Sequence, residues 1–266
     1  MLASFSMYDF PELRAATDSW WSGLASALER AGIEAVPEAL TRDPDIDVWH
    51  SRELLISQTC GYPLTHELAG VVELVATPAY SAEGCSGANY CSLIVVGEDN
   101  PAAGLLDLRG AVCAYSRRHS HSGYNALRAA VAPLAGGGAF FSRVIESGGH
   151  PVSIELVATG QAGVCAVDCV THALIAKCQP NALAGTRVIG ATEAAPGLPY
   201  VTRAGVDKDF MCRLREGLQA TFADPRLADT RDTLLLTDLH ALGYDAYQRI
   251  DDMEDSARAV GYADIH

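Results

Sequence analysis

The chain has 266 residues, a length typical of roughly two domains, and its 49 % hydrophobic and 20 % charged residues indicate a folded globular protein. Its 33 acidic and 19 basic residues give a formal net charge of −14, which disfavours nucleic acid and anionic membrane surfaces as partners. No apolar stretch has the length of a membrane span, and the first residues lack the pattern of a signal peptide. We therefore expect no membrane insertion, and a cytoplasmic location unless a signal peptide has been removed.

The first part of the chain alternates between strand and helix patterns. Residues 2–8 predict a strand, and the apolar spacing that follows predicts a helix, capped by Asp9 and ended by Gly32. Residues 54–57 predict a short buried strand, followed by a polar loop and a short helix. A further apolar run at 71–76 predicts another strand.

The same alternation continues to about residue 191. Strands are expected at 93–96, 111–115, 163–168 and 186–191, and helices at 105–110, 151–159 and 171–177. The Pro- and Gly-containing segment 194–199 breaks the pattern, and mainly helices are expected beyond it, at 207–222 and 244–260. This order predicts an α/β architecture with largely parallel sheets.

A polar, hydroxyl-rich loop at residues 118–127 runs from a predicted strand into a helical pattern. The free N–H groups of a first helical turn and the positive end of the helix dipole favour phosphate, phosphonate or carboxylate. Ser120 and Ser122 add hydroxyl donors. Taken alone, the loop is better explained by a serine that only caps the helix, because such caps are common.

Polar clusters follow the carboxyl ends of several predicted strands. They lie at residues 4–9, 58–62, 117–124 and 147–150 and at Asp168. Open parallel sheets bind ligands at this edge, so together the clusters predict one shared ligand site.

The cysteines and glycines indicate neither a metal nor a nucleotide. Most of the eight cysteines lie inside apolar patterns and lack the close pairs of a zinc site. Cys85 and Cys91 flank a glycine-containing loop, and whether they pair is left open. The glycine-rich segment 135–139 lacks the Lys-Ser/Thr of a P-loop. His119, His121 and Arg118 leave acid–base catalysis open, although no nucleophile elbow or carboxylate pair accompanies them.

Several motifs together carry a family resemblance. They are Tyr90-x-Ser92, Leu105-x-Asp107-Leu108-x-Gly110, Ser120-x-Ser122-Gly123-Tyr124, Gly149-His150 and a strand ending in Asp168. Over nearly its whole length the chain resembles the phosphate/phosphite/phosphonate-binding proteins of ABC transporters. The S-x-S-G loop followed by Gly-His is the most specific part of this resemblance.

The resemblance implies a type II periplasmic-binding fold, with two α/β lobes, each a mostly parallel sheet flanked by helices, joined by two crossover strands. Lobe I would comprise residues 1–92 plus 202–266, and lobe II residues 93–201, which carry the S-x-S-G loop. The implied function is a substrate-binding protein of an ABC-type phosphate/phosphonate transport system that holds a small oxyanion-bearing ligand in the interlobe cleft. An ABC permease in the membrane is the implied partner, the implied location is the periplasm, and neither catalysis, cofactor nor metal is implied.

The resemblance also implies a set of ligand-binding residues. In lobe II these are Tyr90, Ser120, His121, Ser122, Gly123, His150 and Asp168, and in lobe I Tyr8, Gln58, Thr59 and Tyr62, which match only in position. Family loops usually read Ser-Thr-Ser, so His121 replaces a hydroxyl by a ring nitrogen and suggests pH-dependent binding. It also leaves the ligand's identity open. The alternative is a cytoplasmic enzyme or ligand sensor built on the same fold.

Overall fold

The computed structural model describes residues 1–266, which divide into two compact units by their contacts. Unit 1 comprises Met1–Ser81 and Gly197–Ala246, and unit 2 comprises Ala82–Pro196 and Tyr247–His266. This division differs from the expected lobes mainly in the C-terminal segment, which belongs to unit 2. The reason is that Ala257, Tyr262 and Ile265 are buried in the hydrophobic core of that unit.

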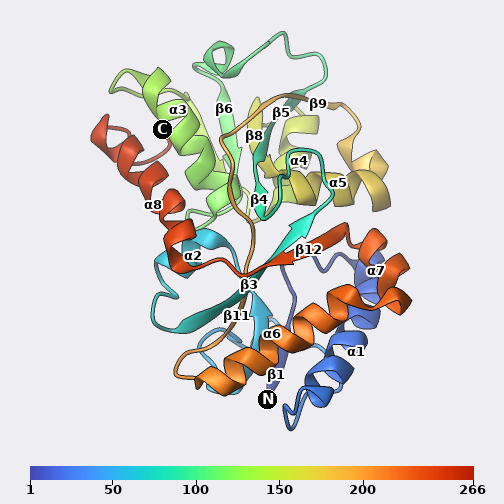
Figure 1. The fold of residues 1–266 in the computed structure, drawn as a ribbon. Coiled ribbons are helices and arrows are strands. Elements are labelled where there is room, and N and C mark those ends of the chain that lie inside the picture. Colours follow the sequence, from blue (N-terminus) through green and yellow to red (C-terminus); the bar gives the residue numbers. More distant parts are fainter. The chain divides into compact units, whose positions relative to one another are not determined.

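Unit 1 is built on a five-stranded sheet with helices packed against it (Figure 1). The strands, in spatial order, are β1 (Leu2–Ser4), β2 (Leu54–Gln58), β11 (Tyr200–Arg203), β3 (Val72–Tyr80) and β12 (Leu236–His240). The helices are α1 (Arg14–Arg30), α2 (Gly61–Thr65), α6 (Lys208–Ala223) and α7 (Ala228–Thr233), with short 3₁₀ turns at Pro11–Leu13 and Pro225–Leu227. Helix α1 packs against both α6 and α7.

Unit 2 has a second five-stranded sheet, with α4 and α5 on one side and α3 and α8 on the other (Figure 1). The strands, in spatial order, are β7 (Arg143–Glu146), β6 (Val112–Tyr115), β8 (Val164–Asp168), β5 (Ser92–Gly97) and β9 (Thr186–Ala191). A two-stranded ribbon joins β4 (Asn89–Tyr90) to β10 (Ala195–Pro196). The helices are α3 (Ala126–Ala135), α4 (His150–Ala158), α5 (Cys169–Cys178) and α8 (Tyr244–Ala259), with short turns at Leu105–Leu108, His121–Asn125 and Pro180–Leu183.

Both sheets are mixed, which corrects the expectation that each is mostly parallel. In unit 1 only β1 and β2 pair in parallel, and in unit 2 β6 pairs in parallel with β7 and β8. Helical crossovers return the chain in the same direction and produce these parallel pairs. Strands β11 and β5 each follow a passage from one unit into the other, so no crossover helix sets their direction, and both lie antiparallel to their neighbours.

Other differences from the expected elements are local. Asp9 does not cap α1, because its carboxylate pairs with Arg42 instead. The first strand ends at Ser4, and strand β12 lies in a region expected to be mainly helical. No helix combines the length and the apolar character that a membrane crossing requires.

Candidate anion-binding site

The site begins where β6 ends and the chain enters a π-helical turn, η3 (His121–Asn125), which continues directly into α3. Ser120 precedes the turn with an extended backbone, and its Oγ accepts a hydrogen bond from Gly123 N at 3.0 Å. The expected capping role is therefore present. It uses the hydroxyl only as an acceptor, so the hydroxyl hydrogen of Ser120 is still able to donate to an anion.

Ser122 connects the turn to the neighbouring strands. Its Oγ lies 3.0 Å from His150 Nε2, and that nitrogen lies 3.5 Å from Asp168 Oδ2. Its carbonyl oxygen accepts a hydrogen bond of 2.9 Å from Ser92 Oγ. Because β6 and β8 are parallel and Ser92 is paired with Asp168, all these groups meet at one edge of the sheet. The S-x-S-G loop, His150 and Asp168 thus come together in unit 2.

The geometry around His150 does not match a nucleophile-activating triad. Ser122 and Asp168 both approach Nε2, whereas a Ser-His-Asp triad places the carboxylate at the other ring nitrogen. Burial lowers the pKa of His150 despite the nearby Asp168 carboxylate, so the ring is neutral at pH 7. A hydrogen on Nε2 gives the neutral ring a donor for Ser122 or Asp168, since a bare lone pair would face the carboxylate.

Asp168 ends β8 and caps α5. Its Oδ1 accepts from Thr171 N at 2.8 Å, and its Oδ2 accepts from the Thr171 hydroxyl. These bonds satisfy part of the carboxylate's acceptor capacity and fix its orientation. The polar cluster therefore has two different ends. The Ser122 hydroxyl and the His150 ring lie at one end, and the Asp168 carboxylate lies at the other.

Ser116 and Gly123 make a close contact that requires glycine. A Cβ added to Gly123 would lie 2.0 Å from Ser116 Oγ and 3.2 Å from His150 Cε1. The buried Ser116 hydroxyl has no hydrogen-bond partner in the protein. Sequence reasoning overlooked Ser116, although its position directly after strand β6 placed it at the edge where the other polar clusters end.

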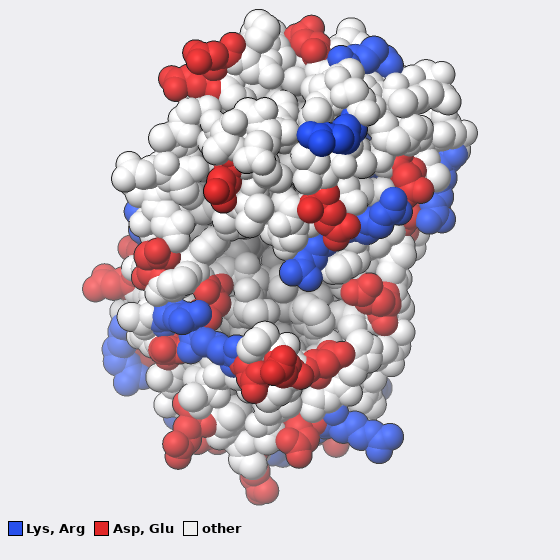
Figure 2. Space-filling model, turned by 180° about the vertical axis from the view of Figure 1, so that it is seen from behind, with Lys and Arg blue, Asp and Glu red and all other residues white.

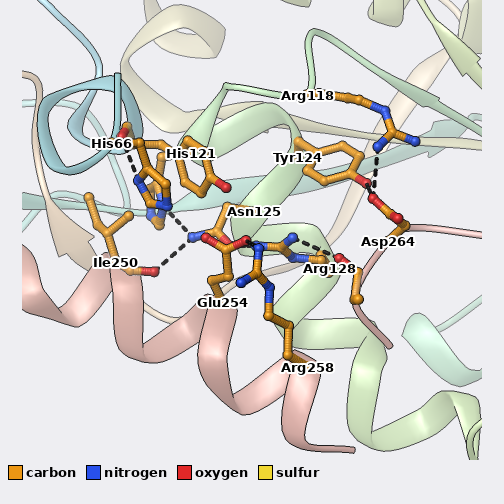
Figure 3. Close-up of polar contacts among 12 residues, drawn as sticks. His66, Arg118, His121, Tyr124, Asn125, Arg128, Ile250, Glu254, Arg258 and Asp264 are labelled. Carbon is orange, nitrogen blue, oxygen red and sulfur yellow. Dashed lines mark hydrogen bonds and ion pairs between the residues drawn. The ribbon is translucent and has the colours of Figure 1, made fainter. Parts of the chain in front are cut away.

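The His121 ring lies beside α8, in a polar network that includes Asn125 (Figure 3). His121 is 2 % exposed, and Asn125 Nδ2 donates to its Nδ1 at 3.2 Å. Arg128 donates to Asn125 Oδ1 at 2.6 Å and lies 3.2 Å from the carboxylate of Glu254. Burial, assisted by the Arg128 charge, lowers the pKa of His121 to about 3. The expected pH-dependent binding through a charged His121 is therefore corrected, because the ring stays neutral in the usual pH range.

Tyr90, the remaining residue of the expected set in unit 2, is buried on β4. Its ring centroid lies 6.0 Å from that of His121. Tyr90 therefore lies on the His121 side of the turn.

The residues expected from unit 1 form no single cluster. Gln58 Nε2 donates to the Tyr80 hydroxyl at 3.0 Å and to Leu198 O at 2.9 Å. Tyr8 meets the Tyr80 ring edge-on at 5.4 Å, and Tyr8 and Gln58 line a cavity of about 30 Å³, enough for one water. The buried hydroxyl of Thr59 has no hydrogen-bond partner. Tyr62 does not line that cavity, and its ring stacks on His66 at 3.8 Å.

The electrostatic setting of the protein is acidic overall. On the face shown in Figure 2, basic and acidic side chains lie in small mixed groups, without a continuous basic patch. With a net charge of −14, the long-range field opposes anions. An anion in unit 2 would therefore depend on local hydroxyl and backbone N–H donors.

Solved structures with the same fold include several binding proteins. A binding-protein component of an ABC phosphonate transporter from Pseudomonas aeruginosa matches with a TM-score of 0.75 and 18 % identity, over 98 % of this chain and 87 % of that one. PhnD1 from Prochlorococcus marinus, in complex with methylphosphonate, matches with a TM-score of 0.74 and 13 % identity, over 97 % and 98 %. A Xanthomonas citri protein bound to chloride ion matches with a TM-score of 0.72 and 17 % identity, over 97 % of each chain.

At these identities the matches establish a mixed α/β, two-lobed periplasmic-binding-protein fold. No curated protein is significantly similar to the sequence. The model of the periplasmic phosphonate substrate-binding proteins of ABC transporters matches residues 53–254, which is most of the chain. The chain therefore belongs to the family of phosphonate-binding, periplasmic substrate-binding proteins of ABC transporters.

Proposed function

We propose that this protein binds a small oxyanion, a phosphonate or a phosphate-like compound, at the polar edge of unit 2. The observation that carries the proposal is the convergence of Ser122, His150 and Asp168 at the start of the η3–α3 helix. In the proposed complex, the hydroxyls of Ser120 and Ser122 donate to the anion's oxygens, and Gly123, whose N–H donates to Ser120 Oγ, allows the turn to lie close to Ser116. Neutral donors and a helix N-terminus bind oxyanions without a basic side chain.

Within the same proposal, His150 and Asp168 give the two ends of the ligand different surroundings. The neutral imidazole donates from Nε2 to Ser122 or Asp168, which leaves the Ser122 hydroxyl hydrogen for an oxygen of the anion, whereas the carboxylate repels the anion. Asp168 therefore suits an amino or hydroxyl group on the far end of the ligand, where a charge-assisted hydrogen bond forms. His121 contributes through its backbone, because its buried ring is engaged by Asn125. Tyr90 packs beside the His121 ring and supports the turn.

The role that we propose for the protein is delivery rather than turnover. It presents its ligand to an ABC permease from the periplasm, and its membership of a family of periplasmic substrate-binding proteins of ABC transporters supports this role. The sharing of one His150 nitrogen by Ser122 and Asp168 supports a non-catalytic role. In unit 1, Tyr8, Gln58, Thr59 and Tyr62 remain proposed ligand contacts, with the unsatisfied hydroxyl of Thr59 as their most direct support.

Isothermal titration calorimetry with methylphosphonate, phosphate, phosphite and 2-aminoethylphosphonate tests the proposal. We expect at least one of these anions to bind. The double substitution Ser120→Ala/Ser122→Ala should weaken that binding by roughly 2–4 kcal/mol, because it removes two hydroxyl donors to a charged group. Asp168→Asn should selectively weaken the aminophosphonate, since Asn preserves the cap on α5 but removes the negative charge.

Ser142→Ala is the matched control, because Ser142 is an exposed serine of unit 2 whose hydroxyl donates to Ala111 O at 3.3 Å. The Ser142→Ala variant should bind the anion with the same affinity as the unchanged protein. The site assignment fails if the double variant binds as tightly as the control. If none of the four anions binds, the proposed ligand class is wrong.

A further inference from the structure

Three cysteines from separate segments of unit 2 meet beside the proposed site. Cys85 lies in the loop before β4, Cys91 lies between β4 and β5, and Cys169 is the first residue of α5. The sulfur atoms of Cys85 and Cys169 are 3.5 Å apart, and Cys169 N donates to Cys91 O at 3.0 Å. All three are free thiols. The structure thus places Cys169, which lies far away in sequence, beside the sulfur of Cys85.

Gly84 shows how tightly the loop covers these thiols. A Cβ added there would lie 2.7 Å from Cys91 Sγ and 3.2 Å from Cys169 Cβ. The backbone φ of Gly84 is +94°, a conformation that also favours glycine. Cys91 and Cys169 are buried under this loop, and Cys85 is partly exposed. A reagent in solution therefore reaches Cys85 first.

We propose that Cys85 and Cys169 are a redox-active dithiol that forms a disulfide by exchange with a glutathione-type disulfide. The Cys85 thiolate attacks one sulfur of the reagent, forms a mixed disulfide and releases the first glutathione thiol. The Cys169 thiolate then attacks Cys85 Sγ and releases the second. Two protein thiols are oxidised, the reagent is reduced to two thiols, and the protons of Cys85 and Cys169 pass to the two released thiolates.

The environments of the two cysteines fit these roles. The hydrogen bond from Cys169 lowers the pKa of Cys85, which favours the attacking thiolate. The hydrogen bond with Cys85 raises the pKa of Cys169 to about 12, so this thiol stays protonated until the mixed disulfide forms next to it. A disulfide requires sulfurs about 2.0 Å apart, so closure from 3.5 Å needs an approach of about 1.5 Å.

The bridge would tie the loop around Cys85 to the strand ends that hold the polar cluster. Cys169 directly follows Asp168, and Cys91 directly precedes Ser92, which is paired with Asp168 in the sheet. We therefore expect oxidation to stabilise unit 2 and to raise the melting temperature by roughly 5 °C or more. The proposal rests on the thiol geometry and holds whichever ligand the protein binds.

The test uses the full chain with Cys212→Ser, which removes an exposed cysteine outside the cluster. The protein is incubated with oxidised and reduced glutathione, the remaining thiols are alkylated, and peptides are mapped by mass spectrometry. We expect a cross-linked peptide pair that contains Cys85 and Cys169 and lacks two hydrogens. The accompanying rise in melting temperature should disappear after reduction by dithiothreitol.

Two variants separate this pairing from its alternatives. Cys91→Ser should retain the Cys85–Cys169 bridge and its thermal shift, whereas Cys85→Ser should abolish both. A bridge that includes Cys91, a mixed disulfide that persists on Cys85, or complete recovery of the alkylated thiols would each overturn the proposal.

Discussion

The two faces of the turn at His121–Asn125 are built for different purposes. On one face, Ser122 contacts His150, which in turn lies close to Asp168, and the buried hydroxyl of Ser116 is unsatisfied. On the other face, His121 and Asn125 are held in a network of hydrogen bonds and ion pairs. Donor capacity is therefore left over on the first face and used up on the second.

The difference follows from what each face packs against. The Ser122 face meets strand ends and the first residue of α4, where backbone and side-chain donors gather. The His121 face meets α8, whose Ile250 carbonyl accepts from Asn125 Nδ2 at 3.0 Å and whose Glu254 pairs with Arg128 (Figure 3). Adjacent residues of one short motif thus serve ligand binding, as proposed, and attachment of the C-terminal helix.

The largest effect should come from Glu254→Gln, on the His121 face of the turn. Arg128 and Glu254 are 3 % and 4 % exposed, so removing the carboxylate leaves a buried cation without its counter-charge. We expect a loss of about 3–5 kcal/mol in the free energy of unfolding, measured by urea denaturation. Anion affinity of the folded variant should stay close to that of the unchanged protein.

Arg258→Ala is the matched control, because Arg258 also pairs with Glu254, at 2.6 Å, but is 58 % exposed. Its effect should not exceed about 1 kcal/mol. Equal losses of unfolding free energy in the two variants would show that the Arg128–Glu254 pair does not stabilise the attachment of α8 through its burial.

Much of the polar edge of unit 2 could be predicted from the sequence, because its parts follow strands directly. The loop with Ser120 and Ser122, the Gly149-His150 turn and Asp168 each come after an apolar run, and parallel pairing of β6 and β8 carries them to one edge. This prediction needed only local patterns and one rule of topology.

The role of His121 could not be predicted in the same way. Its environment depends on α8, which lies more than a hundred residues away in sequence, and no local pattern indicates that contact. Strands β5 and β11 pose the same problem, because their antiparallel pairing depends on where the chain changes units rather than on their residues. Long-range packing is what a single sequence reveals least.

The second prediction concerns Gly123, at the boundary between the two faces. Gly123→Ala places a methyl group 2.0 Å from Ser116 Oγ and 3.2 Å from His150 Cε1, so the turn must shift relative to these two residues. Overpacking of this kind costs about 1–3 kcal/mol, and we expect anion affinity measured by calorimetry to fall by a similar amount. Gly190→Ala, at an exposed site with open space around the added Cβ, should leave affinity unchanged.

A second substitution distinguishes crowding from a general loss of structure. Ser116→Gly removes both the Oγ and the Cβ that the new methyl group meets, so the double variant Ser116→Gly/Gly123→Ala should regain part of the lost affinity. If Gly123→Ala binds normally, the close approach of the turn to Ser116 is not required for binding.

The third prediction concerns a slope, namely how stability depends on pH. In the folded protein the pKa of His121 is lowered to about 3, whereas in the unfolded chain it is about 6.5. The unfolded chain thus binds more protons between pH 6.5 and 3, and stability that is fully present above pH 6.5 is lost as the pH falls. His121 contributes at most about 1.4 kcal/mol per pH unit to this slope.

His121→Asn isolates that contribution, because the Asn side chain does not titrate and its amide oxygen accepts from Asn125 in place of Nδ1. Urea denaturation at several pH values between 7 and 4 should give a shallower slope for His121→Asn than for the unchanged protein. His119→Asn, at an exposed histidine two residues earlier, should keep the original slope. Parallel slopes for all three proteins would mean that the His121 ring is accessible to protons, and that the two faces of the turn are less distinct than their contacts indicate.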